Sequence, residues 1–303
     1  MECTMRKPDF LIVGAPKCGT TALCHYLSKH PDVAISTPAK PYFFGRDLNV
    51  PRTCERLEDY LALFDEHALC CGEGTPYYLY SQTAAQEIYD LNPAMKIIIM
   101  LRNPVDVVYS LYCQRLSNSI DSEPILDFAE AIAAEGDRAQ GKRLPPAYPD
   151  PKMVLYTEIA KFYPQVRRYC DRFPPEQLHV VIYDDLRADV DQVYGQVLTF
   201  LGVDSTYRPP LQVVNPNTTW RSRGLQALVE SPPKRLKTSL NRLGISGKTV
   251  YPLYRALTRF NQKVAGRSPL DPAMKIKLQS LFYSDVEQLS QLLDRSLLHW
   301  LED

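Results

Sequence analysis

Short apolar runs alternate with amphipathic stretches along the first two thirds of the chain. Runs bounded by Gly, Pro or polar clusters predict strands at residues 9–13, 33–35, 69–73, 96–101 and 178–183. The run KIIIML at 96–101 is continuously apolar, which is typical of a strand in a sheet covered on both faces. Helical spacing predicts helices over 20–30, 55–64, 82–91, from 104 onward, over 125–135 and 152–172, and in a segment ending near 203. The alternation predicts an α/β fold with one doubly wound parallel sheet.

Strand patterns disappear from residue 204 onward. Residues 204–224 are a polar excursion, and residues 225–303 predict helices, the last of them carrying MKIKLQSLFYSDVEQLSQLL. We therefore expect a single domain over 1–303. Its α/β core would cover 8–204, and a mostly helical extension over 205–303 would complete the ligand site.

Composition narrows the class of protein. The 303 residues are 45% hydrophobic and 23% charged, which excludes disordered, collagen-like and coiled-coil chains. Lys plus Arg and Asp plus Glu both number 35, and the resulting net charge of +0 disfavours a general nucleic-acid binder. The longest apolar runs fall far short of the ~18 residues of a membrane span. We therefore expect a cytoplasmic protein with no nucleic-acid partner.

The eight cysteines do not form a recognisable pattern. They contain no CxxC pair, so their spacing is neither that of a zinc site nor that of a small disulfide framework. Thiols in a reducing compartment are the expected state. Acidic and histidine residues likewise show no ligand spacing, so we expect no metal.

The first turn between a strand and a helix reads GAPKCGTT, from Gly14 to Thr21. A strand, a glycine-bearing loop and a helix with hydroxyl residues at its start form a phosphate-binding architecture, because backbone N–H groups and the helix dipole face the anion. The common nucleotide loop has Lys after its second glycine. Here that position is Thr20, and Lys17 precedes the glycine instead. This arrangement favours a shorter, single-phosphate anhydride; the alternative is a plain turn with a helix cap.

A second candidate site lies in MLRNPVDVVYSLY at 100–112. Arg102 follows a buried strand, at the sheet edge where α/β proteins bind ligands, and Ser110 lies in the helix after it. An arginine fork and a hydroxyl suit a second phosphate. The alternative is a structural ion pair of the arginine at the sheet edge.

These motifs together resemble the sulfotransferases that use 3′-phosphoadenosine 5′-phosphosulfate (PAPS). The similar segments include GAPKCGTTAL, HPDV, GEGTPYYL, KIIIMLRNPVDVVYSLY and FPPEQLHVVIYDDL, and they extend over residues 8–204 and about 269–301. The resemblance is strongest to bacterial soluble sulfotransferases and to the sulfotransferase domains that modify heparan sulfate. It implies sulfuryl transfer to a hydroxyl or amine of a small-molecule or carbohydrate acceptor, with adenosine 3′,5′-bisphosphate as product.

The resemblance also implies roles for individual residues. Lys17 matches the lysine that contacts the 5′-phosphosulfate bridge, and Arg102 with Ser110 matches the pair that holds the 3′-phosphate. Residues matching the loop around the 5′-phosphate are Cys18, Gly19, Thr20 and Thr21. Further contacts to the 3′-phosphate or ribose are expected from Arg221, Arg223 and Arg267, unless these are solvated charges near helix starts.

One position departs from the family pattern. Many relatives carry a glutamate, taken as the general base, where PAKPYFF places Lys40. A lysine is a poor base unless desolvated and is better suited to neutralising the sulfuryl group, although a solvated surface lysine is the alternative. Glu73 in GEGTP is then the candidate carboxylate base, unless its role is structural. His67 is expected on the surface, and His25 is expected, like His30, to pack in the interior.

Two other functions remain open from the residues alone. One is a phosphotransferase with a degenerate nucleotide loop, which Lys17 in place of a lysine at position 20 disfavours. The other is a non-catalytic nucleotide-binding or partner-binding module, suggested by the lysine in place of the usual base. Acceptor pockets are built from loops that vary on a shared scaffold, so these motifs leave the acceptor and the oligomeric state open.

Overall fold

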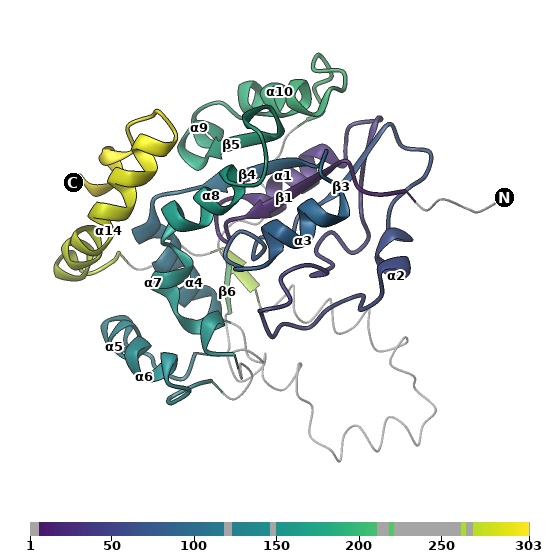
Figure 1. Cartoon of the computed structure of the whole chain (residues 1–303). Helices are drawn as coiled ribbons and strands as arrows, with labels where there is room; N and C mark the ends of the chain where they lie inside the picture. Colours follow the sequence, from purple (N-terminus) through teal and green to yellow (C-terminus); the bar gives the residue numbers. More distant parts are fainter. Residues whose placement is uncertain are drawn as a thin grey trace.

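A five-stranded parallel sheet forms the centre of the computed structural model, which describes residues 6–117, 123–145, 150–210, 218–220, 262–264 and 269–302. Its strand order is β2-β3-β1-β4-β5 (Figure 1). The strands are β1 (Phe10–Gly14), β2 (Val33–Ile35), β3 (Cys70–Glu73), β4 (Lys96–Leu101) and β5 (Leu178–Ile182). All four pairings between neighbouring strands are parallel, so the expected α/β class is confirmed.

Both faces of the sheet are covered. Every residue of β1 is buried, and in β4 only Lys96 is partly exposed. Since successive side chains of a strand point to opposite faces, a continuously buried strand has packing on both sides. The two strands pair in register from Phe10 opposite Lys96 to Ile12 opposite Ile98. The apolar run at 96–101 therefore predicted its surroundings correctly.

Helices follow most strands. In the described ranges they are α1 (Thr20–Leu27), α2 (Leu57–Leu61), α3 (Ala84–Leu91), α4 (Pro104–Ser117), α5 (Phe128–Ala133), α6 (Glu135–Ala139), α9 (Tyr183–Ala188), α10 (Val190–Leu201) and α14 (Pro272–Leu292), with the 3₁₀ turns η2 (Pro175–Gln177) and η3 (Leu298–Leu301). Pro104 begins α4 as expected, because the first helical position needs no amide hydrogen. Gly202 ends α10 in the left-handed conformation, φ 80°. Within these parts of the chain no helix is both long and apolar enough to cross a membrane.

The predicted helix over 152–172 is wrong in its continuity. The structure has three short segments instead, η1 (Pro151–Val154), α7 (Tyr156–Ile159) and α8 (Phe162–Cys170). Pro164 lacks an amide hydrogen, so an uninterrupted helix would lose a hydrogen bond there and clash with the preceding turn. Instead α8 begins afresh at Phe162. The amides of Phe162 and Tyr163 donate to the Asp285 carboxylate of α14 at 2.8 and 3.2 Å.

Two further predictions of local structure need correction. The helix expected over 125–135 is divided into α5 and α6, and α5 begins after Asp127, whose carboxylate caps it by accepting from the Glu130 amide. The absence of strands after 204 is also wrong. β6 (Thr218–Trp220) pairs antiparallel with β7 (Gln262–Val264), and three-residue strands leave no periodic signal in the sequence. The helices predicted over 221–261 lie outside the described residues.

A buried ion pair joins the segments that follow α4. Arg138 on α6 donates to Glu123 at 2.6 Å, and both side chains are inaccessible to solvent. The Tyr156 hydroxyl donates to the other oxygen of that carboxylate at 2.5 Å. Arg115 of α4 donates to the Met153 carbonyl at 2.6 Å. These contacts fix α4, α6, η1 and α7 to one another.

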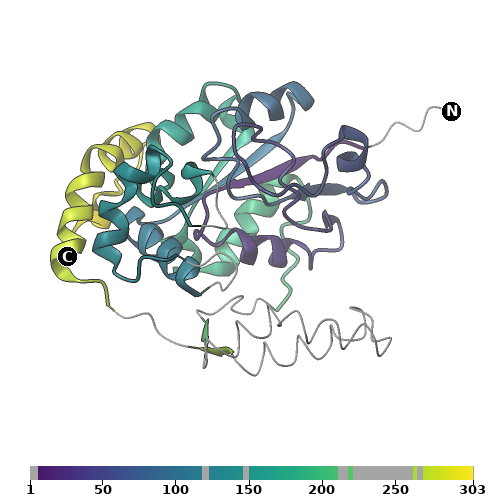
Figure 2. The same cartoon turned by 90° about the horizontal axis from the view of Figure 1, so that it is seen from below.

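The C-terminal helix packs against the core. α14 contacts α8 and α4, and Figure 1 shows it at the left of the molecule, next to α8. Seen from below in Figure 2, the same helix lies along one side of the sheet and its helices. η3 follows α14 and returns to the ends of β4 and β5, where Asn103 donates to the Trp300 carbonyl at 2.7 Å and Trp300 donates to Asp184 at 2.7 Å.

Candidate active site

The loop after β1 is shaped by two glycines. A Cβ at Gly14 would meet the Leu79 side chain at 2.5 Å and the Pro76 carbonyl at 2.6 Å, so only glycine permits this approach of the backbone. Gly19 has φ 94° and precedes α1 as its N-cap, and Lys17 also adopts a positive φ of 68°. The loop therefore turns tightly and brings the first amides of α1 to the carboxyl edge of the sheet.

Cys18 lies in this loop, and its thiol is influenced by the positive charges of Lys17 and Arg102. Its thiol is completely buried, and burial raises its pKa to about 12, while Arg102 and Lys17 act in the opposite direction. Arg102 follows β4 and Lys17 follows β1, and these strands are neighbours in the sheet. The two cations predicted from separate motifs thus lie near one thiol. A buried, protonated thiol is not a nucleophile, so Cys18 serves the shape of the loop.

Arg102 makes an ion pair in this structure. Its guanidinium donates to Asp106 of α4 at 2.6 and 3.2 Å, and its side chain is 17% exposed. It also lies over the Tyr183 ring, 4.8 Å from the centroid. The same ring would touch a Cβ at Gly19 at 3.3 Å, so Tyr183 connects the two turns. Ser110 lies one helical turn beyond Asp106 and is 1% exposed.

Sequence reasoning missed Tyr183. It follows β5 directly, at the same edge of the sheet as Arg102 and the loop after β1. The available signal was its place as the last aromatic of an apolar run, at the edge where parallel sheets bind ligands. The predicted residues Arg221, Arg223 and Arg267 lie outside the described residues.

Lys40 lies in the segment after β2, and its side chain extends to the start of α1. Its ammonium donates to the Thr21 hydroxyl, in the first turn of α1, at 2.9 Å. Burial lowers the pKa of Lys40, because desolvation disfavours the charged form. The Ala39 carbonyl accepts from the Gly74 amide at 2.9 Å, which fastens this segment to the end of β3. Lys40 is therefore not the solvated surface lysine of the alternative interpretation.

Glu73 ends β3 in an apolar and aromatic environment. It is 0% exposed, and burial raises its pKa to about 7 despite nearby hydroxyl groups that oppose the rise. Tyr60 donates to its Oε1 at 3.4 Å, while Oε2 has no hydrogen-bond partner among the described residues. The carboxylate proposed as a base thus lies behind side chains rather than at a surface that an acceptor can reach.

A cavity of about 330 Å³ lies between α1 and the segment that carries Lys40. Its lining residues are Thr21, Cys24, His25, Ser28, Ile35, Ser36, Thr37, Ala39 and Lys40. His25 is exposed here, so the expectation that it packs in the interior is wrong: it occupies the solvent face of α1. His30 is 3% exposed and His67 is exposed, both as expected.

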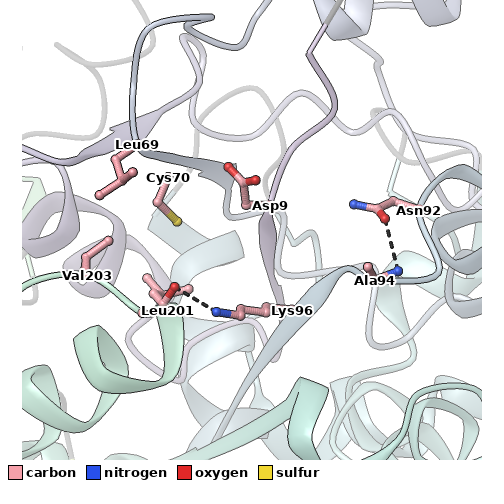
Figure 3. A pocket seen from close by; sticks show the side chains of 9 residues that line it. Asp9, Leu69, Cys70, Asn92, Ala94, Lys96, Leu201 and Val203 are labelled. Carbon is pink, nitrogen blue, oxygen red and sulfur yellow. Dashed lines mark hydrogen bonds between the residues drawn. The ribbon is translucent and has the colours of Figure 1, made fainter.

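A second cavity, of about 290 Å³, lies at the opposite edge of the sheet (Figure 3). Cys70 and Lys96 line it, and they are the first residues of β3 and β4. Lys96 donates to the Leu201 carbonyl at 2.8 Å, and Asp9 accepts from Arg6 at 2.7 Å, so both charges are engaged within the protein. This cavity is remote from the turns that carry the predicted chemistry.

A parallel α/β sheet with a glycine turn at its carboxyl edge is an architecture that places ligands at that edge. The family model for the sulfotransferase domain matches residues 7–219. The chain therefore belongs to the sulfotransferase domain family, and the resemblance inferred from its motifs is confirmed.

Similar proteins agree with this assignment. The chain is 28% identical to mouse bifunctional heparan sulfate N-deacetylase/N-sulfotransferase 3 over 214 residues, 67% of this chain and 23% of that protein. It is 35% identical to mouse heparan sulfate glucosamine 3-O-sulfotransferase 6 over 123 residues, 38% of this chain and 32% of that protein. The chain thus spans a quarter to a third of the length of these relatives. A sulfotransferase from Alicyclobacillus acidocaldarius has a similar structure, with a TM-score of 0.71, 26% identity, and coverage of 97% of this chain and 99% of the other.

Proposed function

We propose that this chain transfers a sulfuryl group from PAPS to a hydroxyl or amine acceptor. The observation that carries the proposal is the pair of anion-binding turns on the neighbouring strands β1 and β4, in a chain of the sulfotransferase family. Two separated phosphate sites suit a nucleotide phosphorylated at both ends of its ribose. A phosphotransferase role is disfavoured, because Thr20 replaces the lysine that such enzymes direct at the outer phosphates.

The donor set suits this nucleotide. Lys17 and the first amides of α1 would hold the 5′-phosphate, and Arg102 with Ser110 would hold the 3′-phosphate. Arg102 is already oriented by Asp106 and Tyr183, so little side-chain entropy remains to be lost on binding. We assign the remaining nucleotide contacts, as proposals, to Cys18, Gly19, Thr20, Thr21, Arg221, Arg223 and Arg267.

The proposed chemistry is in-line transfer. When bound, the donor supplies the sulfuryl group and a phosphate leaving group. Lys17 takes up the charge that develops on the 5′-phosphate, and Thr20 with Thr21 keeps that phosphate in place. Lys40 is held at Thr21 by the 2.9 Å hydrogen bond, where its ammonium can neutralise the sulfonate oxygens. Of the two catalytic candidates Lys40 and Glu73, we therefore assign Lys40 to the reacting end.

A carbohydrate acceptor is the class that the relatives favour. Both mouse relatives are named for heparan sulfate, and we propose that this chain acts on a glucosamine-containing carbohydrate. We also propose one domain over 1–303, supported by the packing of α14 on α8 and α4. We also propose a cytoplasmic location, where thiols stay reduced, because the cysteine spacing in the sequence is not that of a disulfide framework.

Ligand-dependent stability and turnover test the function. A ligand at 100 times its Kd stabilises the folded state by about 2.7 kcal/mol, so adenosine 3′,5′-bisphosphate should raise Tm strongly. AMP and ATP, which lack the 3′-phosphate, are the controls. A shift no larger than that of AMP would remove the 3′-phosphate site from the proposal. Incubation with labelled PAPS and a panel of carbohydrate, alcohol, phenol and amine acceptors, followed by mass spectrometry, should then detect the sulfated product.

A further inference from the structure

The cavity beside Lys40 has two walls of different origin. Thr21, Cys24 and His25 come from one face of α1, because residues three and four apart in a helix are neighbours on its surface. The facing wall is the segment 35–40, which follows β2 and ends at Lys40. The Ser36 amide donates to the Gly72 carbonyl at 2.9 Å, so this wall continues the edge of the sheet.

One end of the cavity lies at the donor side of the proposed site. The Lys40 ammonium and the Thr21 hydroxyl meet there at 2.9 Å, and Thr21 belongs to the first turn of α1. The 5′-phosphate proposed above would lie at that helix end. An acceptor in this cavity would therefore approach the sulfuryl group from the side of Lys40 and Thr21, while the phosphate lies towards the loop.

His25 is placed to receive a proton in this cavity. It lies four residues after Thr21 on α1, which puts the two Cβ atoms roughly 5–6 Å apart on one face of the helix. Among the described residues the titratable side chains lining the cavity are Cys24, His25 and Lys40. Burial raises the pKa of the Cys24 thiol to about 12, so it keeps its proton near neutral pH. Burial lowers the pKa of Lys40, and its hydrogen bond to Thr21 directs it to the proposed donor end of the cavity rather than along the wall that carries His25. Histidine is the side chain that most often serves as general base near neutral pH.

We propose that this cavity is the acceptor subsite and that His25 is the general base, in place of the carboxylate that Lys40 replaces. The inference rests on the proposed sulfuryl transfer. In the step, the acceptor oxygen forms a bond to sulfur, the bond from sulfur to the 5′-phosphate oxygen breaks, and its electron pair stays on the phosphate. The acceptor proton passes to an imidazole nitrogen of His25, and Lys40 stays charged beside the sulfonate.

The walls also indicate the class of acceptor. Hydroxyl groups of Ser28, Ser36 and Thr37 line the cavity with the Thr21 hydroxyl, and they come from both walls. Ser28 and Ser36 donate to carbonyls of their own segments at 2.8 Å, which leaves the oxygen lone pairs to accept hydrogen bonds. These hydroxyl groups can hydrogen-bond a hydroxyl-bearing acceptor, and the rest of the exposed lining, which is the larger part, is apolar. A sugar hydroxyl is not ionised at neutral pH, so its transfer needs a base.

The test compares His25→Gln with the wild type on two acceptors, a glucosamine-containing oligosaccharide and p-nitrophenol. The nitrophenol is partly ionised at neutral pH, and its ionised form needs no base. We expect kcat/KM for the oligosaccharide to fall by about 10²–10⁴, the range for general-base catalysis, and the acidic limb of its pH profile to disappear. Transfer to p-nitrophenol and the Kd of adenosine 3′,5′-bisphosphate should change by less than about threefold. His67→Gln, which alters another exposed histidine, is the matched control and should leave every value unchanged.

Each other outcome has a definite meaning. If wild type sulfates the oligosaccharide and His25→Gln keeps its rate and acidic limb, the base assignment is overturned while the proposed function stands. Equal losses on both acceptors with an unchanged pH profile mean a structural role for His25, and His25→Asn with a thermal melt checks that reading. If wild type uses p-nitrophenol alone, the sugar subsite is overturned. If wild type sulfates no acceptor, the proposed function itself fails.

Discussion

Replacing Lys40 tests how the site stabilises the transferring group. The ammonium lies 2.9 Å from the Thr21 hydroxyl, at the helix end where the 5′-phosphate is proposed. It is shielded enough that burial lowers its pKa, and charge interactions in shielded sites are weakly screened. Loss of one donor to a developing oxyanion costs about 10²–10³ in kcat. We therefore expect Lys40→Met to lower kcat by that factor and to change the Kd of adenosine 3′,5′-bisphosphate by less than about threefold.

The pH profile gives a second, independent readout. Because burial lowers the pKa of Lys40, this group loses its proton at a lower pH than an ordinary lysine. If the ammonium is needed, kcat/KM, which reports the free enzyme, should fall on the alkaline side. Lys40→Arg keeps a positive charge at all accessible pH values, so its alkaline limb should move to higher pH.

The assay is the initial rate of adenosine 3′,5′-bisphosphate release at saturating PAPS and acceptor. Lys29→Met removes an exposed lysine just beyond α1 and is the matched control, expected to keep the wild-type rate. Lys40→Glu should be at least as slow as Lys40→Met, since a carboxylate repels the sulfonate unless it also serves as a base. A Lys40→Met enzyme with wild-type kcat, or a fast Lys40→Glu enzyme, would refute electrostatic stabilisation by Lys40.

Three further predictions follow from buried or paired charges. The pKa of Glu73 in the folded state is about 7 and exceeds its ordinary 4.5, so the folded protein keeps a proton that the unfolded chain loses, and the free energy of unfolding falls as the pH rises between these values. Glu73→Gln should abolish this pH-dependent loss of about 3 kcal/mol, measured by unfolding at several pH values. A changed acidic limb of kcat/KM in the same variant would instead make Glu73 the base. Arg102→Ala should weaken the binding of adenosine 3′,5′-bisphosphate by about 1.5–3 kcal/mol, measured by calorimetry. Lys17→Ala should instead act mainly on kcat, because the charge on the leaving phosphate develops in the transition state. A Lys17→Ala enzyme that shows only a raised KM would contradict the leaving-group role of Lys17. Arg138→Met leaves the Glu123 carboxylate buried without its cation and should cost about 3–5 kcal/mol in urea unfolding, while a loss below about 1 kcal/mol would contradict the stabilising role of this ion pair.

The strands of the core could be predicted because their signal is local. The run at 96–101 forms β4 with the expected bounds, since continuous apolar character has one explanation in an α/β chain. The segment 152–172 was predicted as one continuous helix although Pro164 is a local signal against continuity. The cap on the Phe162 amide could not be predicted, because Asp285 lies more than a hundred residues away in the sequence. Periodicity reports faces of elements and not distant caps.

The candidate site likewise contains residues that could be predicted from the sequence and residues that could not. Lys17 and Arg102 could be placed from sequence, because each lies within three residues of the end of a strand and neighbouring parallel strands end at one edge. Tyr183 was missed, although it contacts Arg102, because an aromatic residue at the end of a strand more often belongs to a core. The burial of Glu73 also had no signal, since its aromatic neighbour Tyr60 comes from a different element.

The lysine at position 40 and the exposed histidine at position 25 have one physical explanation. A cation at the place of the usual carboxylate strengthens the neutralisation of the sulfonate but removes the proton acceptor. A base that takes over from the carboxylate must reach the same acceptor oxygen. It must not lie next to the sulfonate, where negative charge accumulates. A position one helical turn beyond Thr21 would satisfy both conditions, because the proposed 5′-phosphate would lie at the start of α1 and later residues of that helix lie farther from it along the cavity wall. In the proposed step the imidazole would take up the acceptor proton as the bond to sulfur forms, and it would then be a second cation beside Lys40. In the proposed step the charge that His25 gains would offset the negative charge leaving on the phosphate, so the transfer would keep its electrostatic balance with a lysine at position 40.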